Sequence, residues 1–185
     1  EVGSTLFKLS DGMDDGDVYG QVKMRISDDD YISDILIDLE NVTIKMLKEQ
    51  YPSILTRTIT PTPQSHQEAT YCAQRIPEDG LIDWSKPSRE IFNFIRAQSY
   101  PYPGAFTLLN GKKLIICRAN IVDITYYGTA GQVASISNGL VYVICGDQKP
   151  IALESVQLED GAVTSADSVI TTRNVRLGNV SMHIK

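Results

Sequence analysis

The stretch AFTLLNGKKLIICRA, residues 105–119, decides the fold of the second half of the chain. Two runs rich in apolar residues flank the pair Asn110-Gly111, which is typical of a tight β-hairpin turn because both residues tolerate positive φ angles. Apolar runs and turn residues continue to alternate towards the C-terminus. We therefore expect strands at residues 105–109, 113–119, 121–127, 131–136, 140–145 and 151–158. Short strands with turns roughly every 8–12 residues indicate a small barrel or sandwich.

The N-terminal part has a different pattern, which combines strands with a helix. Residues 5–9 and 18–26 favour two strands, and the loop between them, residues 10–17, contains four aspartates and two Asp-Gly pairs. Residues 31–50 carry apolar side chains three and four positions apart, which predicts one long helix that Pro52 ends. The predicted fold class is therefore α/β in the first part of the chain and β in the second.

A proline-containing segment separates these two parts. Residues 59–84 carry three prolines among Thr, Gln and Ser, which predicts an extended linker. A short helix is expected at residues 87–98, because its first residue is proline and its apolar residues share one face. We therefore divide the chain into a first part at residues 1–58, the linker at 59–84 and a last part at 85–185.

Composition and cysteine usage exclude several classes of protein. The 185 residues are 42% hydrophobic and 22% charged, which excludes disorder, collagen and a disulfide scaffold. The apolar runs are far too short to span a bilayer and no signal peptide is evident, so we expect a cytoplasmic protein without a membrane partner. Cys72, Cys117 and Cys145 are predicted to be buried, reduced thiols. Because only two histidines accompany them, no metal site is expected.

Charged residues are distributed unevenly along the chain. Residues 1–84 contain 7 Lys/Arg and 16 Asp/Glu, a net charge of −9, whereas residues 85–185 contain 10 and 7, a net charge of +3. Such a contrast indicates two structural units. The surplus of the second half is small, and its lysines adjoin only at Lys112-Lys113, so the charge pattern does not indicate a nucleic-acid surface.

The acidic loop DGMDDGD, residues 11–17, is the densest polar group of the chain. It follows a predicted strand, which is where sites form in α/β folds. Its carboxylates could bind a hard cation, but the spacing differs from that of an EF-hand, which needs a Glu at the twelfth position. A carboxylate for general acid–base catalysis and a solvated turn remain the other interpretations.

Four segments occur together and in this order: GMDDGDV at 12–18, TPTPQSHQEATYCAQRIPEDGLIDW at 60–84, IRAQSYPYPGAF at 95–106 and GKKL at 111–114. This series resembles the N10-formyltetrahydrofolate-dependent formyltransferases. That family includes methionyl-tRNA formyltransferases, formyltransferases of nucleotide-linked amino sugars and the folate-binding part of formyltetrahydrofolate dehydrogenase. The resemblance implies that the first part is the C-terminal part of a Rossmann-like catalytic domain and that the last part is an OB-like β-barrel domain.

The resemblance also implies roles for the acidic loop. The family's active site contains an Asn, a His and an Asp, and the residue that matches the Asp is Asp14. Asp14 is expected to orient and stabilise the charged His or to relay a proton from the attacking amine. The residues expected to face the pterin ring of the folate are Leu9, Ser10, Asp11, Gly12 and Met13. The family's Asn and His precede this segment and are not in this chain, so we expect the chain to be inactive alone.

The implied activity is transfer of a formyl group from N10-formyltetrahydrofolate to an amine, without a metal. Residues 157–162 lie where the tRNA enzymes carry Gly-Lys-Lys, but they contain two acids and no lysine. A surface that binds tRNA needs Lys and Arg. We therefore expect a nucleotide-linked amino sugar as acceptor, with methionyl-tRNA as the alternative and a homodimer as a possible assembly. A further alternative is a non-catalytic OB-like binding module, in which tyrosines stack on bases.

Overall fold

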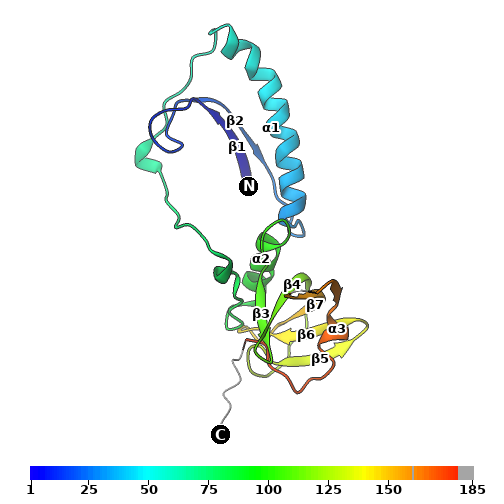
Figure 1. Ribbon diagram of the computed structural model, residues 1–185. Coiled ribbons are helices and arrows are strands. Elements are labelled where there is room, and N and C mark those ends of the chain that lie inside the picture. Colours follow the sequence, from blue (N-terminus) through cyan, green and yellow to red (C-terminus); the bar gives the residue numbers. More distant parts are fainter. Residues whose placement is uncertain (160, 179–185) are drawn as a thin grey trace. The chain divides into compact units, whose positions relative to one another are not determined.

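The computed structural model describes residues 1–159 and 161–178 (Figure 1). The chain forms two compact units, residues 1–74 and residues 75–185, each with most of its contacts within itself. The boundary between the two units falls inside the segment for which we predict a linker. Asp160 and residues 179–185, which we assign to the last part of the chain, lie outside the described residues. Each unit has its own sheet.

The first unit is built on two antiparallel strands, β1 (Val2–Phe7) and β2 (Val18–Met24). Their ladder begins with Val2 opposite Met24 and becomes irregular next to Phe7. The prediction of two strands joined by an acidic loop is thereby confirmed. Strand β1 begins and ends earlier than the predicted residues 5–9, so the loop that follows it is longer than expected.

Helix α1 (Ile32–Leu55) packs on both strands of the hairpin (Figure 1). The prediction that Pro52 ends this helix is wrong, because α1 continues past it to Leu55. Pro52 lies in the last turn, where its missing N–H removes a single hydrogen bond. Its carbonyl accepts a hydrogen bond from the Thr56 N–H at 3.1 Å, which closes that turn. Among the described residues, no helix is both long enough and apolar enough to cross a membrane.

The second unit contains an antiparallel sheet with a helix against it. The strands are β3 (Phe106–Leu109), β4 (Lys112–Ile121), β5 (Val133–Ser137), β6 (Leu140–Ile144), β7 (Pro150–Leu158) and β8 (Val163–Ser165). Their spatial order is β3-β4-β7-β6-β5, and β8 pairs with β7. The helices are α2 (Ser88–Gln98) and α3 (Ala166–Val169), and two short 3₁₀ turns are η1 (His66–Glu68) in the first unit and η2 (Pro77–Gly80) in the second.

The strand predicted at residues 121–127 does not form. Strand β4 instead continues to Ile121, and the residues after it belong to a loop. In this loop the Tyr126 N–H donates to the Gln148 carbonyl at 3.0 Å, and the Gly128 N–H donates to Gln148 Oε1 at 2.9 Å. One side chain and one backbone group of Gln148 therefore hold the loop, and residues 122–127 take no part in a strand ladder.

Residues 176–178, which we call the clasp, connect the two ends of the sheet path. The Leu177 N–H donates to the Gly131 carbonyl, just before β5, at 2.8 Å. The Gly178 N–H donates to the Leu108 carbonyl of β3 at 3.0 Å. Gly178 has a φ of 84°, a left-handed conformation that favours glycine. The clasp thus pairs with backbone at both ends of the sheet.

The core of the second unit lies between α2 and the sheet. Ile91, Phe92 and Ile95 of α2 are buried, and α2 packs on β4 and β7. The Trp84 Nε1–H donates to Thr107 Oγ1 at 2.9 Å, and both side chains are buried. Each of these two polar groups therefore has a partner inside the core, as burial requires.

The three cysteines are free thiols in different environments. Cys145 is buried, and this burial, with a contribution from the charge of Asp147, raises the pKa of its thiol to about 12. Burial also raises the pKa of the Cys117 thiol, which is half-buried. Cys72 is exposed, so the prediction that it is buried is wrong. It lies among residues 69–76, which form neither helix nor strand and offer no apolar layer to cover it.

Candidate functional site

The acidic loop leaves β1 and returns to β2 through a narrow neck. The Lys8 N–H donates to the Asp17 carbonyl at 2.9 Å and closes the neck. Gly16 is buried beside it, and a Cβ at this position would lie 1.7 Å from the Lys8 carbonyl oxygen. Only glycine therefore fits where the two sides of the loop meet.

The side chain of Asp15 lies against other residues of the same loop. The Ser10 hydroxyl donates a short hydrogen bond to the Asp15 carboxylate. A Cβ on Gly12 would lie 2.0 Å from Asp15 Oδ2, so the carboxylate occupies the space that Gly12 leaves open. The Asp15 carboxylate is thereby engaged within the loop, whereas Asp14 accepts a hydrogen bond through its backbone carbonyl.

Asp14 stands at the most unusual backbone position of this loop. Its φ is 55°, which places it in the left-handed region, where Asp is tolerated better than most residues. Its side chain is exposed, and its carbonyl accepts a hydrogen bond from Gln64 Nε2 at 2.8 Å. The loop therefore exposes this carboxylate to solvent, while a hydrogen bond from Gln64 holds the backbone of the same residue.

The residues predicted to face the folate share this loop with Asp14. Leu9 and Met13 are 87% and 92% exposed, which is far more than apolar side chains of this size usually show. The three residues between them are also exposed, namely Ser10, Asp11 and Gly12. The structure thus places all six predicted site residues in one loop, and their roles remain predictions. In residues 1–159 and 161–178, no three His, Cys, Asp or Glu side chains are grouped to hold a metal ion.

Sequence reasoning missed the segment that supports the loop. Residues 62–64 lie beside the start of β2. There the Val18 N–H donates to the Thr62 carbonyl at 2.8 Å, and the Thr62 N–H donates to the Val18 carbonyl at 2.9 Å. Gln64 Nε2 donates to the Gly16 carbonyl at 2.7 Å as well as to the carbonyl of Asp14. A glutamine in a polar segment has no distinctive pattern, so only its place in the motif TPTPQ could have drawn attention to it.

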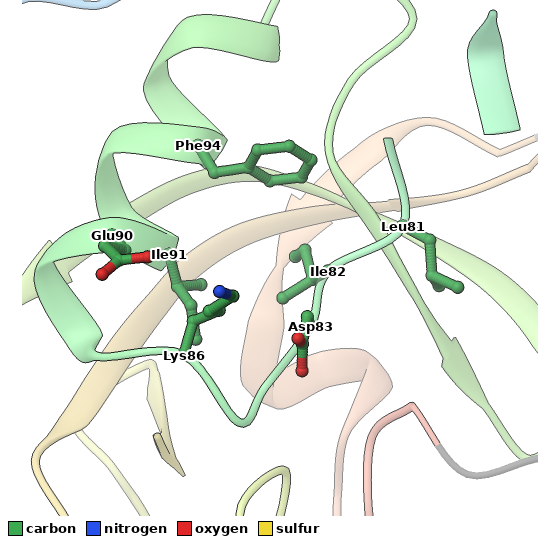
Figure 2. Close-up of a pocket in the computed structure, with 7 residues that line it drawn as sticks. All are labelled: Leu81, Ile82, Asp83, Lys86, Glu90, Ile91 and Phe94. Atoms are coloured by element: carbon green, nitrogen blue, oxygen red, sulfur yellow. The ribbon is translucent and has the colours of Figure 1, made fainter. Parts of the chain in front are cut away.

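The second unit has a separate hollow between α2 and the segment before it (Figure 2). Phe94 of α2 and Ile82 of the extended segment project towards it, and Asp83, Lys86 and Glu90 add charge. The hydroxyl and the N–H of Ser85 donate to Asp83 and lower the pKa of its carboxyl. The hollow measures about 200 Å³, below the range of roughly 300–1,000 Å³ that is usual for ligand pockets. The hollow is therefore smaller than a usual ligand pocket.

Comparison with known families and proteins identifies the relatives of the chain. A family model described as "Formyl transferase, C-terminal domain" matches residues 75–174. The methionyl-tRNA formyltransferase of Sorangium cellulosum is 31% identical over 182 residues, which cover 97% of this chain and 58% of that protein. The chain therefore spans little more than half the length of this relative.

Two solved structures share the fold. HypX from Aquifex aeolicus, in complex with tetrahydrofolic acid, matches with a TM-score of 0.72 and 18% identity, covering 91% of this chain and 29% of that one. The N-formyltransferase from Helicobacter canadensis, in complex with folinic acid and dTDP-3-aminofucose, matches with a TM-score of 0.64 and 20% identity, covering 82% of this chain and 54% of that one. At such identities the likeness concerns the fold.

Proposed function

Since this chain belongs to the formyltransferase family, we propose that the full-length protein transfers a formyl group from N10-formyltetrahydrofolate to an amine. The observation that supports this most directly is the loop between β1 and β2, which presents Asp14 on a held backbone. Because the chain covers 58% of its Sorangium cellulosum relative, the activity is assigned to the full-length protein.

The exposed loop residues suit a folate. Leu9 and Met13 leave apolar side chains uncovered at one end of the hairpin, and a flat pterin ring is a surface on which such side chains pack. N10-formyltetrahydrofolate supplies the formyl carbon. The Asp14 carboxylate, which is exposed at the turn, either keeps an imidazolium charged beside it or accepts the proton that the amine must lose.

The architecture that we propose follows the same family. The β1–β2 hairpin with α1 forms the C-terminal part of a Rossmann-like domain, and residues 75–178 form an OB-like barrel. The antiparallel order β3-β4-β7-β6-β5 and the clasp, which pairs near both ends of that path, support the barrel. Residues 59–84 connect the two as the linker, although the contacts place residues 59–74 with the first unit.

The acceptor that we propose is the amine of a nucleotide-linked amino sugar. Residues 75–185 contain 11 Lys/Arg and 10 Asp/Glu, which is almost neutral. Binding of tRNA relies on neutralising many phosphates, so it needs a clear surplus of cations, whereas a diphosphate needs few. The Helicobacter canadensis N-formyltransferase, which shares the fold, forms a complex with dTDP-3-aminofucose, and this supports a nucleotide-linked sugar.

Methionyl-tRNA is the second candidate, and the sequence comparison favours it. The relative from Sorangium cellulosum, at 31% identity, is a methionyl-tRNA formyltransferase. The balance of charge in the second unit and the identity of this relative therefore point to different acceptors. A direct comparison of the two substrates decides between them.

The test measures formyl transfer by the full-length protein, with N10-formyltetrahydrofolate as donor and either nucleotide-linked amino sugars or methionyl-tRNA as acceptor. We expect rapid formylation of a sugar and at least a roughly 100-fold loss of turnover in Asp14→Asn, because general acid–base groups contribute about that much or more. Asp28→Asn, an exposed aspartate after β2, is the matched control and should keep full turnover. Rapid formylation of methionyl-tRNA but not of any sugar would contradict the proposed sugar acceptor. Formylation of neither acceptor would favour a non-catalytic binding module.

A further inference from the structure

The amide of Gln64 joins the acidic loop to residues 62–64. An amide nitrogen carries two N–H groups, and both have an acceptor here. One bond reaches the Asp14 carbonyl at 2.8 Å and the other reaches the Gly16 carbonyl at 2.7 Å. The two acceptors lie on either side of Asp15, so a single side chain fixes the orientation of the turn that begins at Asp14.

Gln64 is itself held in place by backbone pairing. Two hydrogen bonds join Thr62 to Val18, the first residue of β2, at 2.8 and 2.9 Å. Gln64 is two residues further along the chain, so this pairing also restrains its backbone relative to the hairpin. It is also half-buried, which reduces competition from water for its two N–H groups.

We propose that Gln64 is a positioning residue, which holds the backbone of Asp14 in the left-handed conformation that aims its carboxylate at the reacting groups. This inference rests on the proposed function, because it acts through Asp14. The chemistry of the acceptors explains the residue type: two carbonyls need two N–H donors on one atom. Glutamate has the same shape but offers only acceptors, and asparagine is one methylene shorter.

The first test is structural and does not depend on turnover. In the full-length protein, Gln64→Glu should speed amide hydrogen exchange in a peptide spanning residues 8–18 by about tenfold at pH 7, because two hydrogen bonds are lost and a carboxylate faces two carbonyls. Near pH 4 a protonated carboxyl can donate again, so we expect part of the protection to return. Gln67→Glu is the matched control, since Gln67 is exposed and lies three residues further along. Equal exchange in the two variants at both pH values would overturn the proposal.

The second test concerns the reaction. Gln64→Ala should lower kcat about tenfold and change KM for either substrate less than about threefold, while Gln67→Ala should match the wild type. An unchanged kcat in Gln64→Ala would show that the bonds of Gln64 do not serve the reaction. If the wild type transfers no formyl group at all, the proposed function fails, and hydrogen exchange alone decides whether Gln64 holds the loop.

Discussion

The two units of this chain differ sharply in how they bury apolar residues. In residues 75–178, the buried apolar side chains include Ile95, Leu114 and Leu153, which are completely inaccessible to solvent. In residues 1–74, all of which the structure describes, the buried apolar side chains are Tyr31 and Met46, and α1 leaves Ile37 60% and Leu55 64% exposed. The second unit thus holds itself together by a core, whereas the first relies on a hairpin ladder and one helix face. We therefore expect the two units to unfold at different denaturant concentrations.

The largest effect should come from opening the core of the second unit. Ile95→Ala removes a side chain with 0% exposure, so we expect a loss of about 3–4 kcal/mol in the free energy of unfolding. Trp84, which is the single tryptophan of the chain and is buried in the same unit, reports this transition by fluorescence in urea. Ile37→Ala on α1 is the control and should leave the tryptophan transition where it is. Equal shifts for both variants would mean that the two units unfold together.

A medium effect should appear in the first unit when the neck of the acidic loop is blocked. Gly16→Ala places a methyl group 1.7 Å from the Lys8 carbonyl oxygen, so the neck must open, at a cost of more than about 1 kcal/mol. We expect faster amide hydrogen exchange in residues 8–18 and an unchanged fluorescence transition of Trp84. Gly161→Ala, whose added Cβ would meet no atom closer than 3.5 Å, should change neither measurement. A shift of the Trp84 unfolding transition in Gly16→Ala would show that the two units unfold in a coupled manner.

The smallest effect concerns pH and the start of α2. Burial tends to raise the pKa of the Asp147 carboxyl, but hydrogen bonds from the hydroxyl and N–H of Ser88, together with the N–H groups of Lys149 and Asp147, outweigh it, and the pKa is lowered. A lowered pKa stabilises the fold above the unfolded-state value of about 3.9, and this contribution is lost as pH falls through the folded-state value.

Asp147→Asn should therefore cost less than about 1 kcal/mol at pH 7, and the cost should shrink towards pH 2 as the carboxyl is protonated. Urea midpoints of the wild type and the variant at both pH values measure the difference. The control is Asp123→Asn, which removes an exposed ion pair with Lys149. High salt should abolish the effect of the control but leave most of the effect of Asp147→Asn, because exposed pairs are screened more strongly. A cost for Asp147→Asn that does not shrink at pH 2 would contradict this assignment.

Local patterns predicted most of the elements but not every boundary. The Asn110-Gly111 turn and its flanking strands form as expected, because the turn type follows from those two residues. The loop after β4 lies where an apolar run between turn residues predicts a strand, at residues 121–127. Gln148, which is 20 residues from Gly128 and 22 from Tyr126 in the chain, supplies the hydrogen bonds that hold this loop. The spacing of apolar residues within the loop cannot reveal a contact between residues so far apart in the chain.

The candidate site shows the same division between local and distant information. The acidic loop stands out because its aspartates and glycines are adjacent in the chain. Gln64 lies 50 residues from Asp14, beyond α1, and nothing in the residues around it signals that its amide reaches the loop. Side chains that carry a distinctive charge can thus be predicted from sequence, whereas those that hold the backbone in place become visible only once the chain is folded.

The clasp has a consequence for the order in which the second unit forms during synthesis. Residues 176–178 are translated after all six strands of the sheet, so the carbonyls of Leu108 and Gly131 lack these partners until this segment is available. At roughly 5–20 residues per second, this interval lasts a few seconds or less. During it the nascent sheet carries unpaired strand edges, which are sites of aggregation and of chaperone binding. Completion of the unit thus depends on a segment that is translated after all of its strands.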